Sequence, residues 1–309
     1  MNNLFAPVQR QKMKLRMALT GVSGGGKTLG ALYLAYGLTD DWGKVALIDT
    51  ERERGRAYAS RSDLPIPTGE YLYAGLYAPY SPERYKEYVR QAAEAVGPDG
   101  VVIVDSLSHA WNNEGGVLEI KDRIAAQAGK NSYTAWNEAG REQNGLINYI
   151  LGVDCHTIVT MRSKMEYAME LNERGKQQPV KIGLAPVQRD DTEYEFDIVM
   201  NIGRDHVAVT SKDVTFLDGF GAVITPELGR QLRAWLADGK EPERYFCADC
   251  GARIRDSAKG TARARAAATQ EHFGRTLCEA CTKQALREER AAQSRKEANG
   301  NDTGQPPQG

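Results

Sequence analysis

Short apolar runs alternate with longer amphipathic stretches over the first 238 residues. The runs at 15–20, 44–49, 101–105 and 156–161 are aliphatic and largely uninterrupted, which is typical of strands buried on both faces of a parallel sheet. Helical patterns occupy 29–38, 81–96 and 110–151, the last with a glycine-containing loop at 115–116. Further strands are expected at 196–202 and 206–211, and a last helix at 226–236. This alternation predicts an α/β domain with a mainly parallel central sheet.

Two regions depart from the alternation. Between 163 and 186 charged and polar residues predominate, which indicates a long connection that is either functional or mobile. After residue 238 large apolar residues become sparse, and residues 294–309 have the composition of a disordered tail. We therefore divide the chain into an N-terminal tail (1–12), a main domain (13–238), a small C-terminal module (239–285) and a helical extension with a disordered tail (286–309).

Composition restricts the possible partners and compartment. The formal net charge is -1, from 40 basic and 41 acidic residues, so the whole chain offers no field that attracts a polyanion. No segment has the apolar length of a membrane span or a secretory signal. Four of the five cysteines form two Cys-x-x-Cys pairs, which favours metal binding in a reducing compartment over disulfides. These features predict a cytoplasmic protein without membrane partners.

A glycine-rich loop follows the first predicted strand and precedes the first helix. In this context the backbone N–H groups and the positive end of the helix hold phosphates, so the loop predicts a nucleoside triphosphate site, most simply for ATP. The lysine of the motif reaches the β- and γ-phosphates, and its threonine hydroxyl ligates Mg²⁺. The motif consists of Gly21, Val22, Ser23, Gly24, Gly25, Gly26, Lys27 and Thr28.

Acidic and basic residues stand at the carboxyl ends of three other predicted strands, where ligands bind in such sheets. Asp105 is expected to anchor Mg²⁺ through a water, the alternative being a solvent-facing strand cap. Glu51 is expected to activate the attacking water, with Asp49 as a competitor and a solvated acid as the alternative. Arg162 is a candidate γ-phosphate sensor or DNA contact, although arginines at strand ends are common.

These strand ends resemble those of RecA-type recombinase cores, and a closer resemblance is to phage and prophage RecA-like ATPases of the single-strand annealing group. The resemblance spans residues 14–235 and rests on phrases that occur here in order: Asp49-Thr50-Glu51-Arg52, Ser81-Pro82-Glu83-Arg84-Tyr85, Asp105-Ser106-Leu107-Ser108-His109-Ala110-Trp111, Met161-Arg162-Ser163-Lys164 and Leu184-Ala185-Pro186-Val187-Gln188-Arg189. It implies a RecA-like ATP hydrolase that acts on single-stranded DNA in phage recombination or repair. It also implies a homo-oligomer, ring or filament, with ATP between subunits in the host cytoplasm, and other phage proteins as further partners.

The same resemblance assigns DNA-facing loops and exposes one departure. The loop after Arg162 would face DNA with Lys164, Arg174, Lys176 and Lys181, although nearby glutamates leave a merely solvated loop as the alternative. The family often has Lys-x-Arg after a late strand, acting on the neighbouring subunit's γ-phosphate. Here Lys212 is present, either as the trans-acting residue or as a solvated turn lysine, and Val214 replaces the arginine, which leaves the extent of ATP turnover open. A scaffold or loader protein that turns over little ATP is therefore the alternative function.

The two Cys-x-x-Cys pairs are separated by 27 residues. Each pair can present two thiolates to one tetrahedral ion, so Cys247, Cys250, Cys278 and Cys281 predict a structural Zn²⁺ site, with a redox dithiol as the alternative. Basic residues cluster between the pairs. They predict a nucleic-acid contact, and a solvated helix face or a protein-docking surface would explain them equally.

Overall fold

The computed structural model describes residues 7–171, 177–257 and 259–300, and for 165–171, 177–184 and 295–300 it describes the backbone only. The chain forms two compact units. One is Lys12–Gly239, and the other comprises the residues from Lys240 onward together with the first described residues up to Gln11. Within the described ranges, none of the helices has both the length and the apolar character needed to cross a bilayer.

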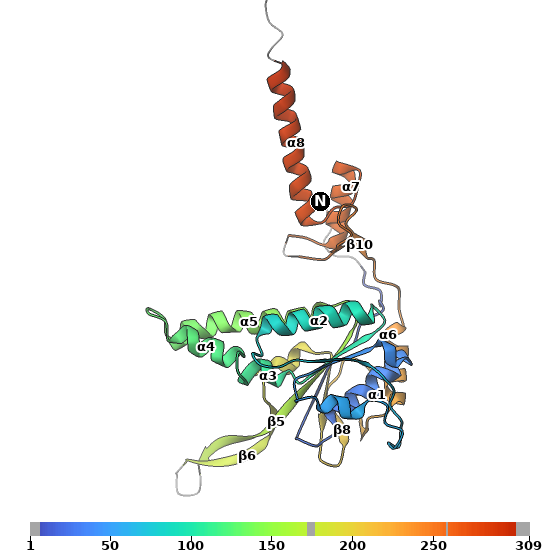
Figure 1. Cartoon of the computed structure of the whole chain (residues 1–309), viewed down its shortest axis with the longest axis vertical. Helices are drawn as coiled ribbons and strands as arrows, with labels where there is room; N and C mark the ends of the chain where they lie inside the picture. Colours follow the sequence, from blue (N-terminus) through green and yellow to red (C-terminus); the bar gives the residue numbers. More distant parts are fainter. Residues whose placement is uncertain (1–6, 172–176, 258, 301–309) are drawn as a thin grey trace, which may run out of the picture. The chain divides into compact units, whose positions relative to one another are not determined.

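The larger unit is built on a nine-stranded sheet with the order β3-β2-β4-β5-β1-β7-β8-β9, and β6 pairs with β5 off this path. The paired strands β5 and β6 are labelled in Figure 1. Neighbours from β3 to β7 are parallel, while β8, β9 and β6 join their partners antiparallel. The strands are β1 (Arg16–Gly21), β2 (Val45–Asp49), β3 (Leu72–Gly75), β4 (Val101–Asp105), β5 (His156–Leu171), β6 (Gln177–Pro186), β7 (Ile198–Ile202), β8 (Val207–Lys212) and β9 (Gly221–Val223). The predicted α/β class with a mainly parallel sheet is confirmed.

Helices cover both faces of this sheet, and alternating strand residues point to each face. Met17, Leu19 and Leu47 pack with α1 and α6 on one face, whereas Ala18, Ile48 and neighbouring side chains pack with α2 and α5 on the other. The central strands β1, β2 and β4 are therefore buried on both faces, which is why their sequences are mostly apolar. The helices of this unit are α1 (Lys27–Thr39), α2 (Pro82–Val96), α3 (Ser108–Asn112), α4 (Val117–Ala125), α5 (Ser132–Gly152) and α6 (Pro226–Ala237).

Strand β5 lies between β1, which leads into the glycine-rich loop, and β4, which ends at Asp105. One strand is thus inserted between the two strands that carry the predicted phosphate loop and Asp105. All of these strands run parallel, so their carboxyl ends meet at one edge of the sheet. The glycine-rich loop, Glu51, Asp105 and Arg162 therefore converge there.

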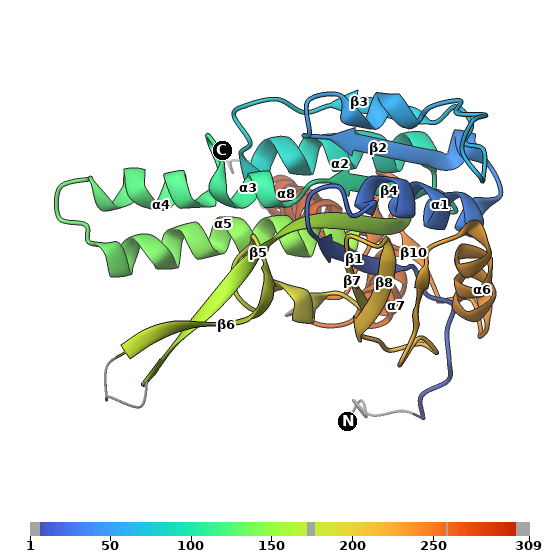
Figure 2. The same cartoon turned by 90° about the horizontal axis from the view of Figure 1, so that it is seen from below.

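The segment after Arg162 differs from the prediction. Instead of an irregular connection, β5 continues to Leu171 and pairs antiparallel with β6, with an irregularity between Glu166 and Tyr167. Figure 2 shows this ribbon extending away from the body of the unit. Large apolar residues stand at every second position of 165–171, the period of a strand, but the many charges in the segment obscured that signal.

The C-terminal unit contains the two-stranded sheet β10 (Tyr245–Phe246) and β11 (Arg253–Ile254), followed by α7 (Ala262–Phe273) and α8 (Glu279–Gly300). Its small core consists of Cys247, Leu277 and Ala285, with Phe273 and two more cysteines packed against them. Because α8 continues to Gly300, the predicted disorder from residue 294 is wrong for 294–300. Residues 301–309 lie outside the described residues.

Candidate functional site

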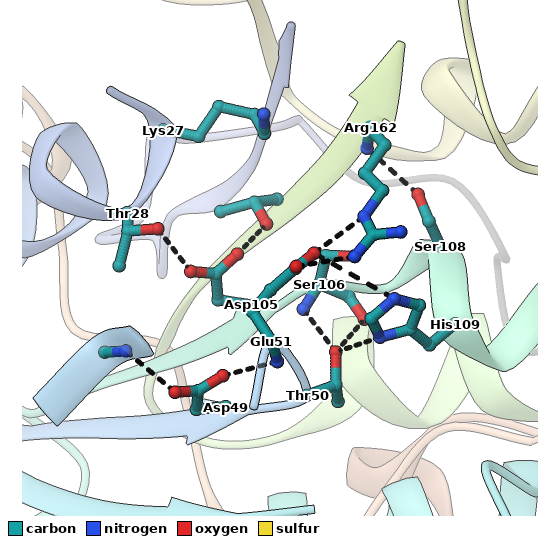
Figure 3. Close-up of polar contacts among 12 residues, drawn as sticks. Lys27, Thr28, Asp49, Thr50, Glu51, Asp105, Ser106, Ser108, His109 and Arg162 are labelled. Atoms are coloured by element: carbon teal, nitrogen blue, oxygen red, sulfur yellow. Dashed lines mark hydrogen bonds and ion pairs between the residues drawn. The ribbon is translucent and has the colours of Figure 1, made fainter. Parts of the chain in front are cut away.

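The glycine-rich loop connects β1 to α1, and its glycines have conformations that other residues adopt rarely. Gly24 and Gly26 have φ of 78° and 94°, in the region that glycine tolerates best. Lys27 donates to the carbonyl oxygens of Gly21 at 3.0 Å and Val22 at 2.9 Å. Figure 3 shows its side chain beside that of Thr28, together with the polar contacts of the neighbouring strand ends. Burial lowers the pKa of Lys27, although Asp105 and Glu51 attract its charge. The loop thus holds a cation over the space that phosphates would occupy.

The two residues predicted to anchor Mg²⁺ lie in contact. The Thr28 hydroxyl donates to Asp105 Oδ2 at 2.5 Å, and the Thr160 hydroxyl donates to Oδ1 at 2.5 Å. Burial raises the pKa of Asp105, and these two hydrogen bonds oppose the rise. A hydroxyl and a buried carboxylate beside a phosphate loop are the hard oxygen donors that suit Mg²⁺, so the donor set fits that ion.

Glu51 and Arg162 form a bidentate ion pair across the carboxyl edge of the sheet. Arg162 Nε donates to Oε1 at 2.7 Å and Nη2 donates to Oε2 at 2.5 Å. Burial alone would raise the pKa of Glu51, but the hydrogen bonds and charge of Arg162 outweigh it and hold the pKa below its ordinary value. The carboxylate is therefore ionised at neutral pH and engaged by the guanidinium.

Asp49, the competitor of Glu51, has a different environment. Its carboxylate accepts hydrogen bonds from the backbone N–H groups of Glu51 at 2.5 Å and Gly55 at 2.8 Å, and from the Tyr73 hydroxyl at 3.0 Å. The side chain thus fixes the turn that follows β2. It supports Glu51 and is itself engaged within the turn.

A hydrogen-bond network lies behind Glu51. Thr50 Oγ1 accepts from the Ser106 N–H at 2.8 Å and lies 2.6 Å from Nδ1 of the buried His109. The other ring nitrogen, Nε2, lies 4.0 Å from Glu51 Oε1. Burial and the neighbouring Arg162 lower the pKa of His109, against the attraction of Glu51, so this imidazole is neutral at neutral pH.

These groups surround one end of a cavity of about 890 Å³, which falls within the usual range for small-molecule sites. Gly21 and Val22 do not line it and instead supply carbonyl oxygens to Lys27. Its phosphate-loop end and the adjoining charged wall consist of Ser23, Gly24, Gly25, Gly26, Lys27, Thr28, Glu51, Asp105 and Arg162. The other part is more apolar and is lined by Tyr33, Tyr58, Pro65, Ile66, Val223 and Ile224, among others.

Three site residues were not predicted from the sequence. Thr160 and His109 act through neighbours on other strands, and His206 lies against the phosphate loop with Nδ1 3.1 Å from the Gly25 oxygen. Their local sequence carries no motif for these roles. Only the strand order, which places β2 and β5 beside β4 and β7 beside β1, could have indicated them.

The remaining candidate residues do not line this cavity. Lys164 is exposed, two positions beyond Arg162 on β5. Lys212 ends β8, and its ammonium donates to the Tyr194 oxygen at 2.5 Å, while Val214 is exposed. Lys181 is on β6, but its side chain is outside the description, and Arg174 and Lys176 lie outside the described residues.

In the C-terminal unit the four cysteines predicted to bind zinc form one cluster. Their sulfur atoms all lie within 4.8 Å of one another, and Cys250 and Cys278 are 3.7 Å apart. Sulfurs around a tetrahedral Zn²⁺ with 2.3 Å bonds are about 3.8 Å apart, so the cluster fits that ion. The basic residues nearby are partly neutralised, since Lys259 pairs with Glu279 and Arg275 with Asp249.

The main domain matches the model of a known protein family. No curated protein matches the sequence. The KaiC-like protein PH0186 from Pyrococcus horikoshii OT3 is a solved structure that covers 68% of this chain and 86% of its own, at 14% identity and a TM-score of 0.36. The model of the family AAA_24, described as an AAA domain, matches residues 13–225, a range that contains the phosphate loop and both site carboxylates. The chain therefore belongs to the AAA_24 family of P-loop ATPases.

Proposed function

We propose that this protein hydrolyses ATP with Mg²⁺ and acts on single-stranded DNA in phage-type recombination, repair or annealing. The observation that carries the enzymatic part is the convergence of Lys27, Thr28, Asp105 and Glu51 at one end of a single cavity. The DNA part rests on the sequence resemblance and on the position of the β5–β6 ribbon.

In the nucleotide complex, the loop N–H groups and Lys27 bind the phosphates. Lys27 then exchanges the carbonyl oxygens of Gly21 and Val22 for phosphate oxygens. The ribose and base occupy the apolar part of the cavity, between Tyr58 and Ile66 on one side and Ile224 on the other. When bound, Mg²⁺ would neutralise developing negative charge on the phosphates, and Thr28 and Asp105 would hold it.

Glu51 is the group that accepts a proton from the attacking water. Its low pKa keeps it ionised, but Arg162 occupies both carboxylate oxygens. Arg162 must therefore release at least one oxygen before Glu51 can orient the water. The γ-phosphate offers Arg162 an alternative anionic partner, so ATP itself favours the active arrangement.

The path from this site to DNA runs along β5. Arg162 and Ser163 line the nucleotide cavity, and the same strand continues directly into the β5–β6 ribbon. A change in the partner of Arg162 therefore alters the base of the ribbon. We expect ATP to order this ribbon on DNA in an oligomer, with Lys164 among the contacts, and Lys212 to act on the neighbouring subunit.

The alternative is a nucleotide-gated scaffold or loader with little turnover. Two observations favour it: Glu51 is held by Arg162, and Val214 is present where the related ATPases have an arginine. The zinc unit would then recruit other phage proteins.

Steady-state phosphate release with and without single-stranded DNA separates the two functions. The ATPase predicts DNA-stimulated release that falls at least a hundredfold in Glu51→Gln, while this variant still binds ATP, and Lys27→Ala loses ATP binding. Release near background in the wild type under both conditions would support the scaffold.

A second experiment tests the coupling between nucleotide and DNA. Labelled single-stranded DNA is titrated at fixed salt with ATP analogue, with ADP and without nucleotide. Equal affinities in the three states would contradict the coupling through β5.

A further inference from the structure

A second cavity of about 400 Å³ adjoins the nucleotide cavity. The two cavities share Glu51, Arg54 and Arg162 as lining residues. The Glu51–Arg162 ion pair, with 2.5 Å between Oε2 and Nη2, is therefore part of the wall between them. The other lining residues of the second cavity are Thr50, Arg52, Ala78, Tyr80, His109, Asn113 and Glu114.

The lining of this second cavity suits an oxyanion. Its lining includes three arginines, Arg52, Arg54 and Arg162, and two acids, Glu51 and Glu114. Arg162 already neutralises Glu51, which leaves a cationic excess in the remainder of the lining. Arg52 makes no ion pair with any residue in the part of the chain that the structure describes. Arginine is well suited to this role because its planar guanidinium donates bidentate hydrogen bonds to phosphate.

The second cavity is also connected to solvent and held in shape. Arg52, Arg54 and Glu114 are exposed residues, so the far side of the cavity opens to water. Arg52 and Glu53 have φ of 58° and 65°, a backbone conformation that side chains other than glycine rarely adopt. The Asp49 carboxylate fixes this turn through the N–H groups on either side of it, those of Glu51 and Gly55. The arginines are thus presented by a constrained turn.

We propose that the second cavity binds inorganic phosphate and is the route by which phosphate leaves after ATP cleavage. This inference rests on the proposed ATPase function. The γ-phosphate would lie between Lys27, Thr28 and Glu51, at the end of the nucleotide cavity beside the ion pair. After cleavage, ADP still fills the rest of that cavity and blocks the way back. The short path outward runs past Glu51 and Arg162.

Arg162 provides the means of passage. A released phosphate presents two or more oxygens to the guanidinium, as the Glu51 carboxylate does, so one anion can replace the other without leaving Arg162 unpaired. No covalent bond forms or breaks in this step. Arg54 lines both cavities and Arg52 only the second, which gives the phosphate a succession of guanidinium partners toward solvent.

The direct test is phosphate binding at equilibrium. Broadening of the phosphorus NMR signal of inorganic phosphate is titrated on the full-length protein saturated with ADP. Two variants alter only the second cavity: Arg52→Glu reverses a charge, and Ala78→Trp fills space. Both should weaken phosphate binding at least fivefold without changing ADP affinity, whereas Arg123→Glu, on α4 and outside both cavities, should change neither. Unchanged phosphate affinity in both variants overturns the proposal.

Two further measurements fix the source of the phosphate. An oligonucleotide that displaces inorganic phosphate competitively would reassign the cavity to the nucleic-acid backbone and overturn the exit role.

In single-turnover experiments, rapid quenching measures cleavage and a phosphate sensor measures release. Arg52→Glu and Ala78→Trp should slow release at least fivefold and leave cleavage unchanged, and equal slowing of both steps contradicts the route. Absence of cleavage in the wild type counts against the ATPase function, and the equilibrium affinities then decide the phosphate site separately.

Discussion

At the scale of single residues, the charge state of Glu51 depends on its partner. Arg162 holds the pKa of Glu51 below its ordinary value of 4.5, although burial acts in the opposite direction. The carboxylate is therefore protonated only when the pH falls below about 4.5. Without Arg162, the effect of burial would be opposed less and the pKa would be higher.

This reasoning predicts a pH effect. In the nucleotide-free wild type, where Arg162 is paired with Glu51, the Glu51 carboxyl should titrate below its ordinary pKa of 4.5. In Arg162→Ala its pKa should be higher, because burial is then opposed less. Carbon NMR of the labelled carboxyl groups at acidic pH measures both titrations, and Glu51→Gln identifies the signal. Identical profiles for the wild type and Arg162→Ala would show that Arg162 does not control this carboxylate.

A second titration affects stability. His156 is buried at the start of β5, its Nδ1 accepts from the Leu15 N–H at 3.0 Å, and burial lowers its pKa to about 3. Because the folded-state pKa is lowered, the stabilisation is complete above the ordinary value of 6.5 and is lost as the pH falls below it. The free energy of unfolding should decrease by up to about 1.4 kcal/mol per pH unit from this residue. Urea denaturation between pH 7.5 and 5 measures the free energy of unfolding as a function of pH. The variant His156→Gln should show a weaker pH dependence. An equal slope in the wild type and the variant would contradict the assignment to His156.

At the scale of elements, α1 and α6 cross in close contact. A Cβ added to Gly37 would lie 2.0 Å from the Pro226 oxygen and 2.8 Å from the Gly229 Cα. Gly145, in α5, has no atom within 4 Å of such a Cβ. The two glycines therefore differ in what they contribute: only Gly37 permits an approach between helices.

Alanine substitutions should separate these roles. Gly37→Ala should destabilise the protein by about 1–3 kcal/mol because the backbones must move apart. Because α1 begins at Lys27, a displacement of this helix should also lower the affinity for ATP. Gly145→Ala should stabilise by about 0.5–1 kcal/mol through helix propensity alone. Thermal denaturation and ATP titration measure both effects, and equal responses of the two variants would contradict the packing explanation.

The strands that are buried on both faces of the sheet were predictable from the sequence because their apolar runs are continuous. The short strands β3 and β9 were not, since their exposed edge positions carry no such run. The glycine loop, Glu51 and Asp105 were predictable because each stands directly after a recognisable strand. His206 and Thr160 were not, because their roles depend on which strands become neighbours, and that order is not written in any local pattern.

At the scale of the whole molecule, the two compact units have different sources of stability. The larger unit has two extensive apolar clusters, whereas the core of the C-terminal unit is small and includes cysteines of the four-sulfur cluster. Such a small unit depends on its cross-links. We therefore expect the bound metal to supply most of its stability.

Metal removal should then affect one unit only. A chelator, or Cys250→Ser with Cys281→Ser, should abolish the one equivalent of zinc expected per chain and unfold the C-terminal unit. ATP binding by Lys12–Gly239 should persist. Metal analysis and thermal denaturation with two resolved transitions measure this, with Cys155→Ala, outside the cluster, as the control. Loss of ATP binding on chelation, or wild-type protein without zinc, would contradict the expectation.

The continuity of β5 has a mechanical consequence. From Arg162 to Leu171 the strand would extend about 30 Å at 3.3 Å per residue, and it pairs with β6 from Ser163 to Leu171 with the one irregularity at Glu166 and Tyr167. If the ribbon moves as one body, a rotation of about 5° at Arg162 would move its far end by about 2.6 Å. Under the proposed exchange of Glu51 for phosphate by Arg162, a small adjustment at the nucleotide would therefore become a larger displacement at the far end, on the order of the spacing between stacked bases.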